Sequence, residues 1–446
     1  MKYLRSFRVW AIALFAFLLT FTISSKALAF CGFYVAKADA KLYNQASQVA
    51  IARSGNRTVL TMANDYQGDV KDFAMVVPVP VVLQQEQVQI ADLRIMERLD
   101  SFSAPRLVEY FDPDPCAPPV FWNRPMAAPA MESAAVERGG RSNQALGVTI
   151  EERFTVGEYD ILILSARESD GLETWLVQNG YRIPQGAREL LRPYIRQRMK
   201  FFVAKVNLEE YENSGYQALR PLQMTYESPR FMLPLRLGMV NANAAQDLLV
   251  YILSPEGQAE VSNYRTVKVP SDAEIPVYVK DEFSDFYKSM FETSYTREGR
   301  NVAFLEYAWD MAGCDPCSAE PLSPEELRQA GVFWTRPDMP NNVFITRLHV
   351  RYTRDKFPED LIFQQTNNRS QFQGRYILRH PYTGDTTCEA GRQYRRSLRQ
   401  RFEQEAQTLA RLTGWNIREI REKLPQVRAD VAPSFLGAWL GRLLGM

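Results

Sequence analysis

Histidine is rare in this sequence of 446 residues, which contains only His349 and His380. Imidazole is the side chain that most often serves as a general base near neutral pH, so at most these two residues could serve as a histidine general base. The sequence also lacks Gly-x-Ser-x-Gly, His-Glu-x-x-His and a glycine-rich phosphate-binding loop. These absences exclude the hydrolase classes that carry those motifs.

An apolar run long enough to span a membrane is missing from the N-terminus. Val9–Ile23 has 15 residues, whereas about 20 are needed to cross the hydrocarbon core. Basic residues precede this run and Ala27-Leu28-Ala29 follows it. This order is typical of a secretory signal peptide, so we expect residues 1–29 to be removed between Ala29 and Phe30. The mature protein is then exported to the periplasm or beyond, with or without membrane association.

A strong net charge is also absent. Residues 1–29 hold four Lys or Arg and no Asp or Glu, so the mature chain keeps 49 basic and 52 acidic residues, a net charge near −3. Such a balance gives no global electrostatic attraction to nucleic acid, and we predict no nucleic-acid partner. The charged and aromatic fractions, 24% and 12%, are typical of a folded globular chain.

Cysteine is sparse, with five residues in the whole chain: Cys31, Cys116, Cys314, Cys317 and Cys388. In an exported protein we expect them to form disulfides. Because five is odd, at least one cysteine is spare or pairs with another molecule. The sequence does not fix the pairing.

The N-terminal region, residues 30–116, has the patterns of β-strands. Val49–Arg53 and Thr58–Met62 flank a Ser-Gly-Asn-Arg turn, which predicts a β-hairpin. Phe73–Val82 predicts a further strand, whose two prolines place its end at a sheet edge or outside the sheet. Ile90–Leu99 has the spacing of a short amphipathic helix.

Residues 117–146 are rich in Pro, Ala and Gly and predict a flexible linker that proteases cut first. The central region, residues 147–388, mixes strand and helix patterns. Residues 389–424 predict two C-terminal helices with a break at Gly414. We therefore expect an α+β fold of antiparallel, sandwich-like β-sheets with peripheral helices and disulfides.

Several motifs together resemble a known family. They are Cys31-Gly32-Phe33, the segment Phe73–Pro80, Tyr307-Ala308-Trp309-Asp310, Cys314-Asp315-Pro316-Cys317 and the segment Leu409–Trp415. The chain is similar, over roughly Cys31 to Leu424, to the exported bacterial family known as domain of unknown function 2330. The resemblance implies a cell-envelope or secreted bacterial protein. It supplies no activity, ligand or catalytic residue.

Cys314-Asp315-Pro316-Cys317 is the sharpest local motif. A Cys-x-x-Cys pair acts in redox chemistry when a helix N-terminus stabilises the thiolate. Here Asp315 opposes a thiolate and the next predicted helix begins only at about Pro324, so a structural disulfide is favoured. A zinc site of Cys314, Cys317 and Cys388 with His380 or His349 has suitable ligand types but lacks the close spacing of zinc motifs.

The predicted strand Phe344–Tyr352 alternates in polarity. Arg347, His349 and Arg351 share one face, and three cations in a row could bind a carboxylate or phosphate. The alternative is a solvated strand face paired with acids of a neighbouring strand.

The C-terminal tail, residues 425–446, carries an apolar stripe and glycines four residues apart. A helix of about 12 residues is too short to span a bilayer. Phe435, Trp439 and Leu443 are therefore expected to pack on the protein itself, on a partner or on a membrane surface.

The leading functional hypothesis is a non-catalytic cell-envelope protein that binds or scaffolds, because no catalytic constellation is present. The alternative is a thiol- or zinc-dependent enzyme at Cys314 and Cys317. No cofactor is predicted, and the partner is not specified by the sequence.

Overall fold

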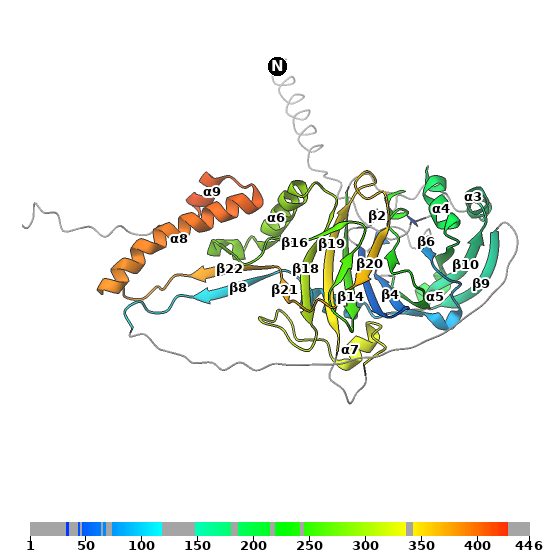
Figure 1. The fold of residues 1–446 in the computed structure, drawn as a ribbon, viewed down its shortest axis with the longest axis horizontal. Helices are drawn as coiled ribbons and strands as arrows, with labels where there is room; N and C mark the ends of the chain where they lie inside the picture. The colour runs from blue at the N-terminus through cyan, green and yellow to red at the C-terminus, as the bar shows by residue number, and fades with distance from the viewer. Residues whose placement is uncertain are drawn as a thin grey trace, which may run out of the picture.

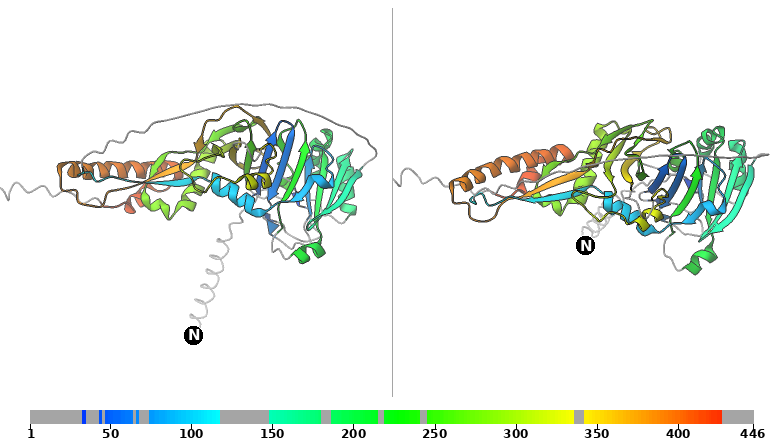
Figure 2. Two further views of the ribbon diagram at one scale, coloured as in Figure 1. Left: turned by 90° about the horizontal axis from the view of Figure 1, so that it is seen from below. Right: turned by 60° about the horizontal axis from the view of Figure 1, so that its bottom comes forward.

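The computed structural model describes residues 33–34, 43–44, 47–63, 66–67, 74–117, 148–179, 186–214, 219–240, 245–335 and 342–426. These residues form a β-rich body and an arm that projects from one end of it (Figures 1 and 2). The body holds two large sheets. The arm consists of a small sheet, β17-β22-β8, and the helices α8 and α9.

The first large sheet has the strand order β1-β6-β11-β10-β9, and every adjacent pair is antiparallel. Its strands are β1 (Phe33–Tyr34), β6 (Ala74–Val79), β11 (Lys200–Val206), β10 (Tyr159–Ala166) and β9 (Val148–Val156). Among the described residues, β1 pairs with β6 only at Met75 and Val76. The segment of β6 that carries Pro78 therefore has one neighbour, as expected for a proline that cannot donate to a second strand.

The second large sheet is mostly antiparallel, and only the pairs β14–β3 and β16–β18 are parallel. Its strands, in spatial order, are β16 (Arg265–Lys268), β18 (Val302–Asp310), β19 (Phe344–Tyr352), β14 (Gln246–Ser254), β3 (Ser47–Ser54), β4 (Arg57–Ala63), β12 (Leu222–Glu227) and β7 (Val88–Ile90), with β21 (Phe372–Gln373) paired to β18. The predicted hairpin is confirmed as β3 and β4, with Ser54 opposite Arg57.

The main hydrophobic core lies between these two sheets. Met75, Ile161 and Phe202 of the first sheet join Leu60 and Val250 of the second in one buried cluster. Two mostly antiparallel sheets that share a core form a sandwich, so the predicted α+β, sandwich-like fold class is confirmed. Both sheets contain strands from residues 30–116 and from residues 147–388, and strands of the two regions pair with each other, so these two regions do not form separate cores.

Helices cover the outer faces of the sheets. The described helices are α2 (Leu93–Ser103), α3 (Ser169–Gln178), α4 (Ala187–Arg196), α5 (Leu208–Ser214), α6 (Phe283–Arg297), α7 (Pro324–Gln329), α8 (Glu389–Thr413) and α9 (Ile417–Glu422), with short 3-10 segments η2 (Gln85–Gln87), η3 (Gly238–Val240) and η4 (Val277–Lys280). Helices α3 and α4 pack on the first sheet. Helices α2 and α7 pack on the second sheet, and Phe291 of α6 packs there against Phe304 of β18.

Helix ends follow the capping residues. Asp92 accepts a hydrogen bond from the backbone of Arg94, so the helix expected at Ile90–Leu99 begins only at Leu93. Ile90, the first residue of the expected helix, belongs to β7. Ser323 and Glu326 form a capping box, and α7 begins at Pro324, where a helix was predicted.

The arm is built on a parallel sheet. Its strands are β17 (Ala273–Ile275), β22 (Arg375–His380) and β8 (Arg106–Phe111). Apolar residues of α6, α8 and β22, such as Phe286, Leu409 and Tyr376, form its core. The predicted C-terminal helices are confirmed as α8 and α9, separated by Gly414 with its left-handed φ of 74°.

A disulfide closes the outer end of the arm. Cys116, five residues after β8, bonds to Cys388, the residue that caps α8, across 272 positions of sequence. Two smaller sheets complete the described structure, β13-β20-β15 and β2-β5, with strands β13 (Met232–Leu233), β20 (Leu361–Gln365), β15 (Ala259–Val261), β2 (Tyr43–Asn44) and β5 (Tyr66–Gln67).

Several predictions concern residues outside the described ranges. These are the signal peptide with its Ala29–Phe30 cleavage site, Cys31, nearly all of the linker at 117–146 and the apolar stripe with Phe435, Trp439 and Leu443. Among the helices that the structure describes, none is both long and apolar enough to cross a membrane.

The small strands β13, β20 and β15 contain none of the residues that the sequence predicted for a site.

Candidate functional site

The candidate site is built on β19, the strand that sequence analysis singled out. Phe344–Tyr352 is a strand, but nearly every side chain on both faces is buried. The expected half-buried pattern is wrong because helices cover the polar face as well. Leu348 and Val350 enter the core between the sheets, while Arg347, His349 and Arg351 lie on the opposite face.

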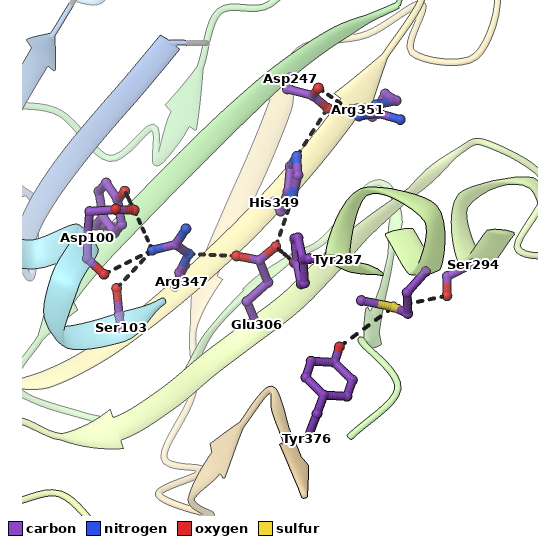
Figure 3. A network of polar contacts seen from close by, with 12 residues as sticks. Asp100, Ser103, Asp247, Tyr287, Ser294, Glu306, Arg347, His349, Arg351 and Tyr376 are labelled. Atoms are coloured by element: carbon purple, nitrogen blue, oxygen red, sulfur yellow. Dashed lines mark hydrogen bonds and ion pairs between the residues drawn. The ribbon is translucent and has the colours of Figure 1, made fainter. Parts of the chain in front are cut away.

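A β-bulge brings a carboxylate to this face. The register of β18 against β19 shifts between Leu305 and Tyr307, so Glu306 is the extra residue of the bulge. A bulge turns a side chain away from the ordinary alternation of the strand. The Glu306 carboxylate accepts hydrogen bonds from Nε of Arg347 at 2.6 Å and contacts Nδ1 of His349 at 2.8 Å (Figure 3).

The next strand, β14, supplies the second acid. Asp247 lies opposite Arg351 in the β14–β19 register. Its Oδ1 is 3.1 Å from Nε2 of His349 and 2.7 Å from Nε of Arg351, and its Oδ2 accepts from Nη2 of Arg351 at 2.8 Å. His349 therefore lies between two carboxylates, one on each ring nitrogen (Figure 3).

Helices extend this chain of charges at both ends. From α2, Asp100 accepts a hydrogen bond from Nη1 of Arg347 at 2.7 Å. From α6, Glu292 accepts one from Nη1 of Arg351 at 2.7 Å, and Tyr287 donates to Glu306. We call this set the charge ladder; its charges alternate in sign in the order Asp100, Arg347, Glu306, His349, Asp247, Arg351, Glu292.

The ladder fixes the protonation of His349. Burial lowers the pKa of its imidazole, but Glu306 and Asp247 outweigh burial and raise that pKa to about 9. Burial raises the pKa of Glu306, but Arg347 and His349 overcome it and hold that pKa at about 2. At neutral pH the imidazole is therefore a cation that donates from both nitrogens, and it is not available as a general base.

Aromatic rings complete the packing of the ladder. The ring of Phe291 stacks on His349 with centroids 3.9 Å apart, and the guanidinium of Arg351 lies 4.9 Å from the same ring. Arg347 lies 5.4 Å from the ring of Tyr251. Each of the three cations proposed to bind an anion is thus already paired with carboxylates of the protein. The arrangement favours the alternative in which this strand face pairs with acids of the protein, although the face is buried and not solvated.

Glu306, Asp247 and Asp100 were not identified from the sequence. One signal was present, because Glu306 is a single acid inside the apolar segment Val302–Trp309. A buried charge requires a partner, so this residue could have been matched to the cations of β19. Nothing local marks Asp100 or Asp247, which come close only through the fold.

The cysteines and His380 are divided between two places. Cys314 bonds to Cys317, and Cys388 bonds to Cys116. His380 contacts Glu109 at 2.7 Å and stacks on Phe111. The residues considered for zinc are therefore not brought together, and no group of three or more His, Cys, Asp or Glu in the described ranges is placed to hold a metal ion.

A surface pocket of about 550 Å³ is present elsewhere, between the β4–β12 pair and the segment that follows β6. Val81 and Val82 line it together with Glu86, Glu227 and Arg57. Its volume lies in the range of small-molecule sites. It contains no group from the charge ladder or from the cysteine pairs.

Comparison with known proteins places the chain in a family. Residues 25–364 match the family described as an uncharacterized protein conserved in bacteria, domain of unknown function 2330. The chain belongs to this family, and the resemblance seen in its motifs is confirmed. The match ends within β20, so β22, α8 and α9 of the arm lie beyond it. No curated protein and no solved structure matches the chain.

Proposed function

We propose that this protein is an exported bacterial cell-envelope protein that binds or scaffolds without catalysis. The observation that carries the proposal is the pairing of four cysteines into two disulfides, Cys116–Cys388 and Cys314–Cys317. Disulfides persist in oxidising compartments and are rare in the bacterial cytoplasm. The signal-peptide pattern of residues 1–29 supports the same compartment.

The contacts within the charge ladder support a structural role for these buried polar residues. Its two helices, α2 and α6, lie at opposite ends of a line of ion pairs across β18, β19 and β14. Both nitrogens of His349 are engaged, and each arginine is paired. Such a cluster fixes the position of helices on a sheet and leaves no group ready for proton transfer.

Export is tested by expressing the full chain in a bacterial host and measuring the intact mass of the protein from the periplasmic fraction. We expect a chain that begins at Phe30 and contains the Cys116–Cys388 bond in non-reduced peptide maps. The variant Ala29→Arg should retain residues 1–29, because signal peptidase requires a small residue there. Wild-type protein found in the cytoplasm with residues 1–29 intact would contradict export.

The absence of catalysis is tested at the motif of the alternative hypothesis. A thiol or zinc enzyme at Cys314 and Cys317 requires free thiols or bound metal in the native protein. We expect no reaction of either cysteine with an alkylating reagent and less than stoichiometric zinc by metal analysis. Two alkylated thiols at this motif, or one zinc ion per chain, would support the enzyme instead.

A further inference from the structure

The loop that contains Cys314 and Cys317 lies at the root of the arm, where β8 and β22 leave the body. The backbone oxygen of Pro316 accepts a hydrogen bond from Nη1 of Arg106 at 2.9 Å. Arg106 is the first residue of β8. The backbone oxygen of Asp315 accepts one from Nε2 of Gln373 at 2.6 Å, and Gln373 lies two residues before β22.

The same loop also holds the end of α2. The hydroxyl of Ser318 donates to the backbone oxygen of Ser101 at 2.6 Å, and Nη2 of Arg106 donates to that of Phe102 at 2.8 Å. Four hydrogen bonds thus connect the loop, α2, the first residue of β8 and Gln373, which lies two residues before β22. Their geometry depends on the position of one short loop that the disulfide closes.

Part of the surface beneath this loop is apolar, where Cys314 packs against a buried cluster that includes Tyr307 and Met311, and part of it is polar. Arg106, Tyr307 and Gln373 are each more than nine-tenths buried, at 7%, 1% and 5% exposure. Each keeps one polar atom without a hydrogen-bond partner of good geometry: Nε, Oη and Oε1 respectively. The guanidinium of Arg106 lies over the ring of Tyr307; burial raises the pKa of the Tyr307 hydroxyl, and Arg106 opposes that rise.

Opening the loop therefore exposes groups that gain hydrogen bonds to water. The apolar contact of Cys314 opposes opening through the hydrophobic effect, and the polar part of the surface opposes it less. The covalent bond between Cys314 and Cys317 restrains the loop in addition to these contacts. Its removal should shift the loop toward an open, hydrated state.

The two sulfurs differ in access. Cys317 is exposed, whereas Cys314 is partly buried against an apolar cluster. Thiol–disulfide exchange begins with attack by a thiolate on the accessible sulfur. The guanidinium of Arg106 is held against the backbone of the loop between the two cysteines, and the carboxylate of Asp315 is exposed. From the sequence, only the negative charge of Asp315, which disfavours a thiolate, was apparent.

We propose that the Cys314–Cys317 disulfide is a modification site for an external dithiol, and that its reduction loosens the root of the arm. One thiolate of the dithiol bonds to Sγ of Cys317, and the bond to Cys314 breaks with that sulfur leaving as a thiolate. The second thiolate of the dithiol then displaces Cys317. The dithiol loses two electrons and two protons and becomes a disulfide, and the two cysteines gain them as thiols.

The test is hydrogen exchange with mass detection on the mature protein, before and after treatment with dithiothreitol in native buffer. Peptides that cover residues 104–108 and 371–376 report on the root of the arm, and a peptide of β10 reports on the body. We expect alkylation of Cys314 and Cys317 after treatment, about tenfold faster exchange at the root, and unchanged exchange in β10.

Two paired variants separate the disulfides. Cys116→Ser/Cys388→Ser keeps only the loop disulfide and should still respond to dithiothreitol at the root. Cys314→Ser/Cys317→Ser should exchange fast at the root without treatment and should not respond further. If this second variant does not fold, the response of the wild type and of the first variant decides the question alone.

Equal exchange at the root before and after reduction of Cys314–Cys317 would overturn the proposal. So would reduction that occurs only when β10 also loses protection, because the disulfide would then be accessible only in the unfolded chain. Both results are independent of export, which the mass of the periplasmic protein tests separately.

Discussion

At the scale of single residues, Glu306 is the most deeply buried carboxylate of the charge ladder. Its carboxylate is 1% exposed and bonds to Arg347, His349 and Tyr287. Removing one member of a buried ion pair leaves the charge of its partner without compensation. The free energy of folding lost in this way is larger than the stability that the intact pair provides relative to apolar residues in its place. The ladder is therefore more vulnerable at Glu306 than at its exposed end.

We expect Glu306→Gln to lower the free energy of unfolding by about 3–5 kcal/mol, because it leaves the Arg347 guanidinium without its buried carboxylate. Urea titration followed by tryptophan fluorescence measures this loss. The matched control is Glu292→Gln, at the end of the ladder where the carboxylate is 53% exposed. It should cost less than about 1 kcal/mol. Equal effects of the two substitutions would contradict a buried, coupled ladder.

His349 predicts a pH dependence. Its folded-state pKa of about 9 lies above its ordinary value of 6.5. The fold binds this proton more tightly than the unfolded chain does, so the contribution to stability is complete below pH 6.5 and is lost as pH rises through 9. Thermal melts from pH 6 to 10 should show the decline. His349→Gln should lose it and His380→Gln should keep it; a decline shared by all three proteins would assign it to other groups.

At the scale of elements, α8 carries a second buried carboxyl, that of Glu405. The pKa of Glu405 is raised to about 7, mainly by burial. Arg401 lowers this pKa, and the nearby carboxylates of Glu274 and Asp112 raise it further. Arg401 pairs with Asp112 at 2.6 Å and lies 3.5 Å from Glu405. The helix therefore packs best when Glu405 is neutral.

We expect the stability of the wild type to fall as pH rises from 4.5 through about 7, because the folded-state pKa of Glu405 is raised. Glu405→Gln imitates the neutral acid and should melt at a higher temperature than the wild type at pH 8 and at a similar temperature at pH 4.5. Glu403→Gln, on the exposed face of the same helix, is the control. A variant at Glu405 that is destabilised at both pH values would show that the charged form is required.

Local sequence patterns predicted most helices, strands and turns, but they did not predict contacts between residues that are far apart in the sequence. The hairpin at Ser54–Arg57, the cap at Ser323 and the break at Gly414 depend on neighbours in sequence, so each was visible. The boundary of α2 was missed because a single cap at Asp92 overrode the helical spacing before it. Burial of the polar face of β19 depends on α2 and α6, which no local pattern connects to it.

The candidate site shows the same limit. Sequence placed Arg347, His349 and Arg351 on one face, which the structure confirms. It did not supply their partners, because Asp100 and Asp247 lie on elements far away in sequence and Glu306 reaches them through a bulge. A strand with one acid among apolar residues is the one sign that the sequence contained.

At the scale of the whole molecule, the chain passes repeatedly between regions that sequence analysis separated. Strand β6 lies beside β11, β3 lies beside β14, and β8 lies beside β22. Each pair joins a strand before residue 117 to a strand after residue 147. Any cut between those residues therefore leaves both fragments as parts of the same sheets, with the Cys116–Cys388 bond between them.

Limited proteolysis tests this organisation. The density of Pro and Gly at 117–146 predicts the first cut there. The two fragments should elute together from a sizing column, since separating them would break both sheets and the core between them. They should also migrate as one band in denaturing gels without reductant and as two bands with it, because only the disulfide survives denaturation. The variant Cys116→Ser/Cys388→Ser should give the same single peak on the column but two bands without reductant. Fragments of the wild type that separate on the column would show that the shared sheets do not hold the molecule together, and a first cut outside 117–146 would contradict the linker.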